Sequence, residues 1–304
     1  MEKFDIHILG CGSALPTLKH HPTSQVLNIR EKLFMIDCGE GTQQNFRRTH
    51  LKFSRLNHIF ISHLHGDHCF GLIGLISTLN LLGRTNALYI YGPSGIKEFL
   101  MPQIDFFCPN IAFEVIIKSF STKKKALIYE DRTLTVHAIP LRHRLPTMGF
   151  YFEERAPLPH IRRDMIDFLK IPIYAINGIK QGADWITEDG AFYPNERLVF
   201  PATPARKYAY LSDTCFVPEN ADLVKGATLL YHEATFLESE AKRAEETQHS
   251  TAKQAAEFAK LADVQQLLIG HYSGRYDSED QHLSEAQTIF PNTLLAQEGL
   301  CISI

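Results

Sequence analysis

The 304-residue sequence lacks the features that mark several common classes of protein. Its six cysteines include no CxxC pair, which excludes a zinc ribbon and a disulfide framework and favours the reducing cytoplasm as its location. The first residues, MEKFDIHILG, have no basic segment followed by an apolar one, so no secretory signal is expected. The longest apolar stretch, around CFGLIGLIST, is interrupted by glycines and too short to span a bilayer.

The sequence also lacks an excess of one charge. Its formal net charge is -3, which excludes a general electrostatic affinity for nucleic acid, so any RNA binding would need basic residues gathered locally. With 44% hydrophobic residues over 304 positions, the chain has enough apolar material for one large domain or two smaller ones.

Strand-like and helix-like patterns alternate along most of the chain. A buried helix is expected from about Asp67 to Leu82, and a second helix over residues 250–262. Strands are expected at FDIHILG, SQVLNIR, KLFMIDCG, HIFISH, ALYIYGP, IAFEVIIKSF, KALIYE, TLTVHAIPL, RKYAYLSD, TLLYHEA and QQLLIGH. This interleaving in both halves, together with antiparallel-looking hairpins, favours a layered α/β domain over an all-parallel fold.

One segment interrupts this alternation. Residues 153–201 are rich in proline and charge, hold the only tryptophan, Trp185, and separate two strands that would otherwise be neighbours. We interpret them as an insertion projecting from the domain, although an ordinary surface excursion has the same composition.

The strongest chemical signal is the motif HLHGDH. His63 and His65 leave the end of a strand on the same side, and Gly66 allows a tight turn before Asp67 and His68 enter a helix. Histidine and carboxylate are the ligands of hydrolytic zinc sites, and burying so many of them without a metal would be costly. One loop with this spacing can supply ligands to two adjacent metals.

Further ligands are expected where other apolar strands end. His143, Asp213 and His271 each follow such a strand, and side chains at strand ends converge at one edge of a sheet. Glu233 also follows a strand, and His249 precedes a helix. A carboxylate that orients an imidazole makes a good general acid, although a lone histidine or a carboxylate at a helix start often has no such role.

Together these motifs resemble the metallo-β-lactamase superfamily and, within it, the ribonuclease Z family of tRNA 3′-processing endonucleases in its short form. The resemblance covers nearly the whole chain. Its motifs are LGCGSALPT, DCGEGTQ, ISHLHGDHCFGLIGL, RHRLPTMGF, YLSDT, HEATF, HSTA and HYSGRY. HPTSQ departs from the Arg-Asn pair that is common in the family, so no substrate contact is assigned there.

The resemblance implies an αββα four-layer sandwich formed by a single domain over 1–304, acting as a zinc-dependent homodimer. It implies that one zinc ion is held by His63, His65 and His143, a second by Asp67, His68 and His271, with Asp213 bridging the two. Asp67 would accept a proton from the attacking water, and His249, supported by Glu233, would protonate the leaving oxygen. The helix after His68 is the expected dimer surface.

The same resemblance implies that residues 153–201 form a flexible arm that binds precursor tRNA away from the active site. The arm contains six Lys or Arg and eight Asp or Glu, so its one basic patch, RRDMIDFLK, makes Arg162 and Arg163 the candidate RNA contacts. Cleavage would leave a 3′-hydroxyl on the tRNA and a 5′-phosphate on the trailer.

Two alternatives remain open from the sequence. A small-molecule metallohydrolase of the same fold, acting on a phosphodiester, sulfate or thioester, would need no arm. A non-enzymatic RNA-binding protein on a retained fold would be expected to have lost some of the metal ligands.

Overall fold

The computed structural model describes residues 2–121, 123–202 and 204–304. The chain forms two compact units. The larger comprises Met1–Asp131, Thr135–Phe152 and Arg206–Ile304, and the smaller comprises Arg132–Leu134 and Glu153–Ala205. None of the helices in the described residues is both long and apolar enough to cross a membrane.

The larger unit contains two seven-stranded sheets. The first has the order β18-β1-β2-β3-β4-β5-β6. Its strands, in that order, are Cys301–Ser303, Phe4–Gly10, Ser24–Ile29, Lys32–Ile36, Leu56–Phe60, Leu88–Pro93 and Val115–Phe120. The second has the order β17-β16-β15-β14-β9-β8-β7. Its strands are Thr293–Leu295, Gln266–Gly270, Leu229–Glu233, Lys207–Leu211, Thr147–Glu154, Leu134–Leu141 and Ala126–Glu130.

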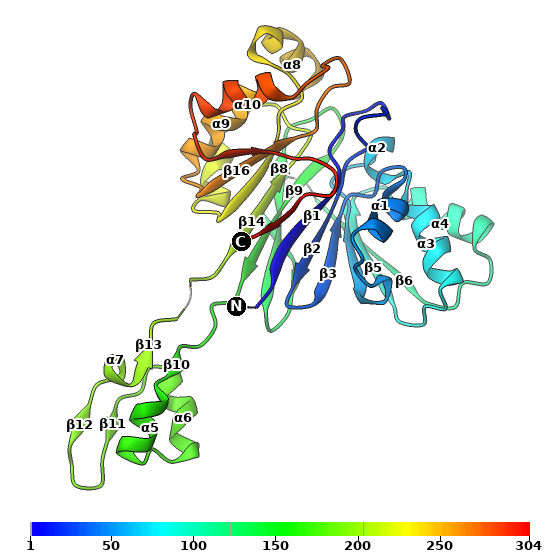
Figure 1. Cartoon of the computed structure of the whole chain (residues 1–304). Coiled ribbons are helices and arrows are strands. Elements are labelled where there is room, and N and C mark those ends of the chain that lie inside the picture. The colour runs from blue at the N-terminus through cyan, green and yellow to red at the C-terminus, as the bar shows by residue number, and fades with distance from the viewer. Residues whose placement is uncertain (1, 122, 203) are drawn as a thin grey trace. The chain divides into compact units, whose positions relative to one another are not determined.

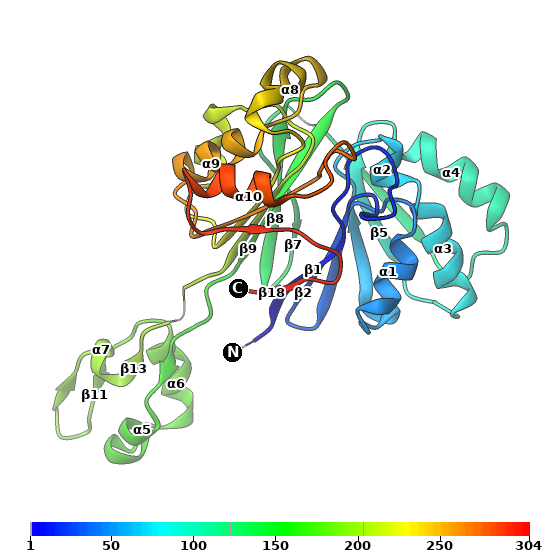
Figure 2. The ribbon, with the colours of Figure 1, turned by 45° about the horizontal axis from the view of Figure 1, so that its top comes forward.

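Helices cover the outer faces of both sheets (Figures 1 and 2). On the first sheet these are α1 (Thr42–Arg48), α3 (Leu72–Leu81) and α4 (Ile96–Phe107), with α2 (Gly66–Cys69) at its edge. On the second sheet α9 (Ala252–Leu261) and α10 (Asp280–Gln287) lie outside, with α8 (Ala241–Thr247) nearby. Short 3-10 helices are η1 (Phe53–Arg55), η2 (Pro218–Val224) and η3 (Glu238–Glu240). The predicted αββα sandwich is confirmed.

Aromatic rings fill the space between the sheets. The ring centroids of Phe34 in β3 and Phe152 in β9 lie 6.0 Å apart, and those of Phe60 in β4 and Phe150 in β9 lie 5.5 Å apart. All four side chains are fully buried, so each contributes roughly 2 kcal/mol or more of hydrophobic stabilisation. Their packing fixes one sheet on the other and so fixes the strand ends that carry the site.

Two features differ from the sequence-based expectation. The strand β9 was not predicted; it lies between β8 and β14 in the sheet, and residues 153–201 follow it directly. The single helix expected from about Asp67 to Leu82 is wrong, because the chain forms α2 and α3 with a break at Phe70 and Gly71. A Cβ on Gly71 would lie 2.1 Å from the carbonyl oxygen of Gly39, so the break brings two backbones together where only glycine fits.

The smaller unit has its own apolar core, formed around Ile171, Ile179 and Leu198. Its helices are α5 (Arg163–Leu169), α6 (Ile173–Lys180) and α7 (Asn195–Leu198). Two short antiparallel pairs complete it: β10 (His160–Ile161) with β13 (Val199–Phe200), and β11 (Trp185–Ile186) with β12 (Phe192–Tyr193). We refer to residues 153–201 as the arm.

Candidate metal centre

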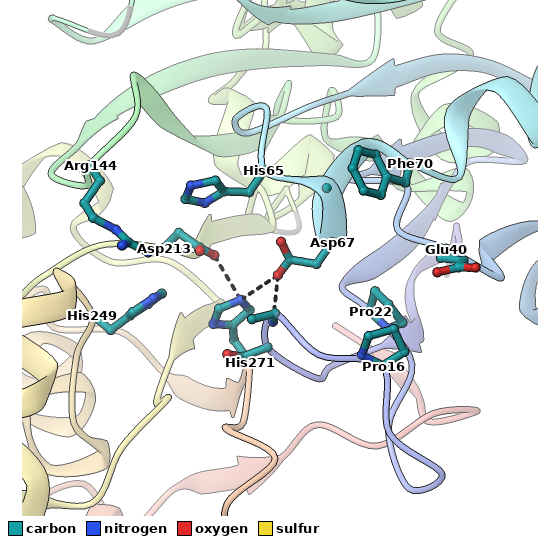
Figure 3. Close-up of a pocket in the computed structure, with 13 residues that line it drawn as sticks. Pro16, Pro22, Glu40, His65, Asp67, Phe70, Arg144, Asp213, His249 and His271 are labelled. Atoms are coloured by element: carbon teal, nitrogen blue, oxygen red, sulfur yellow. Dashed lines mark hydrogen bonds and ion pairs between the residues drawn. The ribbon is translucent and has the colours of Figure 1, made fainter.

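The seven predicted ligands come together at one end of the sandwich. His63 and His65 follow β4, Asp67 and His68 lie in α2, and the other three follow strands of the second sheet: His143 after β8, Asp213 after β14 and His271 after β16. Because β14, β15 and β16 are parallel, their carboxyl ends meet at one edge, as the sequence indicated. Figure 3 shows His65, Asp67, Asp213 and His271 directed into one pocket.

Three imidazoles and a carboxylate form the first donor set. Nδ1 of His65 lies 2.9 Å from Nε2 of His63 and 3.3 Å from Nε2 of His143. Oδ2 of Asp213 lies 3.5 Å from Nε2 of His63 and 3.7 Å from Nε2 of His143. Together these four side chains have one donor atom each within 4.8 Å of the others, as a tetrahedral zinc site requires.

The second donor set shares Asp213 with the first. Its Oδ1 lies 3.1 Å from Nε2 of His68 and 3.2 Å from Nε2 of His271. Oδ2 of Asp67 completes the set, 3.5 Å and 3.7 Å from the same two nitrogens. Since Asp213 offers one oxygen to each set, it is placed to bridge two metals.

Hydrogen bonds at Nδ1 orient the imidazoles. Nδ1 of His68 lies 2.8 Å from Oδ2 of Asp37, and Nδ1 of His143 lies 2.9 Å from the carbonyl oxygen of Gln248. Both partners accept hydrogen bonds, so Nδ1 of each ring donates and Nε2 of each ring faces the centre. Such outer partners fix the tautomer and orientation of metal-binding histidines.

Two hydroxyl groups act in the same way. Nδ1 of His63 lies 3.0 Å from Oγ of Ser62, and Nδ1 of His271 lies 2.9 Å from Oγ1 of Thr235. Each hydroxyl already donates to a buried carboxylate, so it accepts from the imidazole. Among the described residues, Nε2 of His68 and of His271 are buried without a hydrogen-bond partner. Buried ring nitrogens that face one point without a hydrogen-bond partner are what a bound cation requires. These residues are therefore suited to bind a metal ion.

Asp37 holds several parts of the site together, and the sequence did not predict this role. It is fully buried and accepts hydrogen bonds from the backbone N–H of Ser62 at 2.7 Å, from the hydroxyl of Tyr210 at 2.7 Å and from His68. The motif DCGEGTQ contained the signal, but no role was assigned to its aspartate. Asp37 ties the metal-binding turn after β4 to the second sheet.

Charges within the cluster set its protonation states. Burial alone would raise the pKa of Asp213, but the neighbouring imidazoles of His271, His68 and His63 hold it well below its usual range. Burial lowers the pKa of His63 and of His143, which keeps both rings neutral. Burial opposes the charged form of His68, but the carboxylates of Asp213, Asp67 and Asp37 raise the pKa of this ring well above its usual value. A divalent metal would therefore displace a proton from His68 when it binds.

Backbone strain is concentrated at the same place. Asp37, Asp213 and His271 have φ angles of 55°, 59° and 62°, in the left-handed region that non-glycine residues rarely adopt. Such strain persists where surrounding contacts over-determine the conformation, and it is common at functional sites. The left-handed backbone at the ends of these strands directs the three side chains toward the site. No pattern in the sequence predicts this conformation.

His249 and Glu233 are in direct contact. Nδ1 of His249 lies 2.9 Å from Oε1 of Glu233, which is fully buried at the end of β15. Burial lowers the pKa of His249, but the carboxylate of Glu233 outweighs it and raises this pKa to about 9. A capping box between Thr251 and Gln254 starts α9 and fixes the turn that carries His249. The pair is therefore built to keep a protonated imidazole at the pocket.

A second buried ionic cluster supports the loop that lines the pocket. His20, to which the sequence assigned no role, lies with Nδ1 3.0 Å from Glu298 and Nε2 3.1 Å from Glu279. Burial opposes the charged form, yet hydrogen bonds to both carboxylates raise the pKa of His20. The same loop brings the N–H of Ala14 to 2.8 Å from Oδ2 of Asp67, so the cluster helps to place a ligand of the centre.

The two sheets, their covering helices and the clustered metal donors define a metal-dependent hydrolase of the metallo-β-lactamase fold. The metallo-beta-lactamase fold protein YhfI from Bacillus subtilis shares this fold, with a TM-score of 0.70 at 15% identity, and each chain covers all of the other. Residues 4–100 also match the family described as anti-Pycsar protein Apyc1.

Two comparisons are narrower. Human tRNase Z, short form, is 27% identical with a TM-score of 0.72 over 99% of both chains. Ribonuclease Z of Bacteroides thetaiotaomicron is 59% identical over 304 residues, all of this chain and 96% of that protein. The chain belongs to the ribonuclease Z family.

Proposed function

We propose that this protein is a zinc-dependent endoribonuclease that removes the 3′ trailer from precursor tRNA, leaving a 3′-hydroxyl on the tRNA and a 5′-phosphate on the trailer. Its relatives carry the name of this activity over the full length of the chain. The observation that carries the proposal is the pair of donor sets sharing Asp213, with the His249–Glu233 pair beside them. We also propose the cytoplasm, where precursor tRNA is processed, as its location.

Two zinc ions per chain are proposed, held as the resemblance implied. His63, His65 and His143 would bind one, Asp67, His68 and His271 the other, and Asp213 both. When bound, such a pair supplies an activated water and neutralises charge on the phosphate that is attacked.

The protein's own groups would move the protons. Asp67 would accept the proton of the attacking water while the N–H of Ala14 holds its Oδ2 in place. His249 would donate a proton to the leaving 3′-oxygen of the tRNA, since Glu233 holds its Nδ1 and favours the charged ring. Acid and base would then act from different sides of the same pocket, which His249 and Asp67 both line.

A homodimer is proposed through α3 and α4. Both helices end in pairs of exposed apolar side chains: Leu81 and Leu82 are 85% and 52% exposed, and Phe106 and Phe107 are 77% and 62% exposed. Patches of this kind mark association surfaces.

Light scattering tests the dimer. The wild type should have twice the mass of the 34.6 kDa chain, and Leu81→Asp with Phe107→Asp should have the mass of one chain. Leu261→Asp, which changes an exposed leucine at the end of α9, is the matched control and should stay dimeric. A wild type of single-chain mass would contradict the proposal.

The arm is proposed to bind the tRNA. Arg163 is exposed, whereas Arg162 pairs with Asp164 at 2.8 Å and lies over the ring of Phe200. The arm also exposes large apolar side chains, among them Phe168, Ile173 and Tyr174. With more acidic than basic residues, it would bind RNA with few phosphate contacts, so its affinity should fall only gently with salt.

Removing the arm separates this function from that of a small-molecule hydrolase. The variant replaces residues 156–198 with a short flexible linker, and precursor tRNA and bis(p-nitrophenyl) phosphate are the two substrates. We expect cleavage of the tRNA to fall by about a hundredfold or more, through the loss of roughly 3 kcal/mol or more of binding energy. Hydrolysis of the small ester should stay within about threefold, because the arm has its own core and all seven ligands lie outside it.

The outcomes are distinct. Undiminished tRNA cleavage by the shortened protein would remove the arm from substrate binding. Turnover of the small ester without any tRNA cleavage by the zinc-loaded wild type would instead support the small-molecule alternative.

A further inference from the structure

An exposed aromatic ring lines the pocket of the metal centre. Phe70 is 64% exposed, yet it lies two residues after His68 and borders a pocket of about 380 Å³ that also contains Asp67, His249 and His271. No proposed step of the reaction uses this ring. An aromatic ring that is open to water inside a pocket of polar groups can contact a ligand that has an apolar face.

The ring of Phe70 is held from one side. A Cβ on Gly66 would lie 2.3 Å from Cε2 of Phe70, so one face of the ring packs directly on the backbone of this glycine. The next residue, Gly71, is fixed by the N–H it donates to the carbonyl of Cys38 at 2.8 Å. The backbone on both sides of Phe70 is therefore fixed, and one face of the ring is left open to a ligand.

The two ends of the pocket differ in chemistry. Figure 3 shows His249 and Arg144 at one end, and Phe70, Pro16 and Pro22 at the other, with the metal-binding side chains between them. Arg144 is the one Lys or Arg among the described residues that line this pocket. One end therefore offers a cation for a phosphate, and the other offers an apolar surface beside the exposed carboxylate of Glu40.

The position of His249 sets the direction of the RNA. If His249 protonates the leaving 3′-oxygen, the last tRNA nucleotide lies at the His249 and Arg144 end. The strand then continues across the centre, so the first trailer nucleotide lies at the Phe70 end. A trailer nucleotide that is not base-paired can be bound by stacking of its base on an aromatic ring.

We propose that Phe70 stacks on the nucleobase of the first trailer nucleotide and so positions the scissile phosphate over the metal centre. This inference rests on the proposed tRNA-processing function. Stacking tolerates any base, since every base has a π-face, and so suits trailers whose sequences differ.

A cycle of protein and substrate changes tests the proposal. Phe70→Ala, Phe70→Trp and wild type are assayed on precursor tRNA carrying either a normal or an abasic first trailer nucleotide. With the normal substrate, Phe70→Ala should raise KM roughly tenfold, the effect of losing one stacked base, while kcat stays within about twofold. Phe70→Trp should retain the wild-type KM, and all variants should bind the same amount of zinc.

The abasic substrate gives the decisive comparison. It should raise the KM of the wild type about as much as Phe70→Ala does, and Phe70→Ala should add nothing further on it. Removing the base of the last tRNA nucleotide instead should leave the full Phe70→Ala penalty. An equal penalty on normal and abasic trailers, or none on either, would overturn the proposal. If the zinc-loaded wild type does not cleave precursor tRNA at all, the proposed function fails as well.

Discussion

Asp213→Asn is expected to lower kcat/KM for precursor tRNA by on the order of 10³-fold or more, since a shared carboxylate contributes several kcal/mol to a two-metal site. The two oxygens of Asp213 face different donor sets, and its carboxylate lies within 3.7 Å of four imidazoles. Asparagine also tolerates the left-handed backbone at this position, so the loss reports on charge rather than on strain.

A matched control separates the centre from the fold. Asp263 also has a left-handed backbone, with φ of 50°, but it is exposed in the turn after α9. Asp263→Asn should keep the activity and zinc content of the wild type, whereas Asp213→Asn should bind less zinc by elemental analysis. Full zinc content and activity in Asp213→Asn would contradict a bridging role.

His249→Ala is expected to lower kcat by about 10²- to 10⁴-fold, the usual contribution of a general acid, with KM and zinc content little changed. The reason is that Arg144, the other cation among the described residues at this end of the pocket, does not release its protons near neutral pH. His249 also lies close enough to Asp213 and His271 to be a metal ligand. A loss of zinc in this variant would therefore assign it to the metal centre instead.

The leaving group provides a sharper version of this test. A substrate with sulfur in place of the bridging 3′-oxygen releases a thiolate, which needs no proton. On this substrate His249→Ala should approach the rate of the wild type. The wild type itself should lose activity on the normal substrate as pH rises through about 9, where His249 loses its proton, and this decline should be absent with the sulfur substrate. A large defect of His249→Ala on both substrates would argue against an acid role.

The strand pattern predicted a layered α/β domain and the residues at its strand ends for one physical reason, whereas the αββα sandwich was implied by the family resemblance. Apolar runs of strand length mark where each strand stops, and parallel strands bring their carboxyl ends to one edge. His63, Asp213 and His271 are far apart in the chain but follow such runs. The strand pattern and the arrangement in layers were enough to predict that these three residues lie close together.

Other parts of the site depend on contacts between distant residues and could not be predicted in this way. His20 looked like a lone histidine, because its carboxylate partners Glu279 and Glu298 lie more than 250 positions further along the chain. The break between α2 and α3 depends on the close approach of Gly71 to Gly39. Periodicity along one segment carries no information about such approaches.

The most direct test of the account is zinc titration of the metal-free protein, followed by release of the trailer from precursor tRNA. Cleavage should be absent without metal, and it should rise to a plateau at about two zinc ions per chain, as a two-metal centre requires. The products should be a tRNA ending in a 3′-hydroxyl after its last mature nucleotide and a trailer with a 5′-phosphate. Cleavage that persists after complete metal removal, or zinc-loaded protein that leaves the trailer attached, would contradict the account.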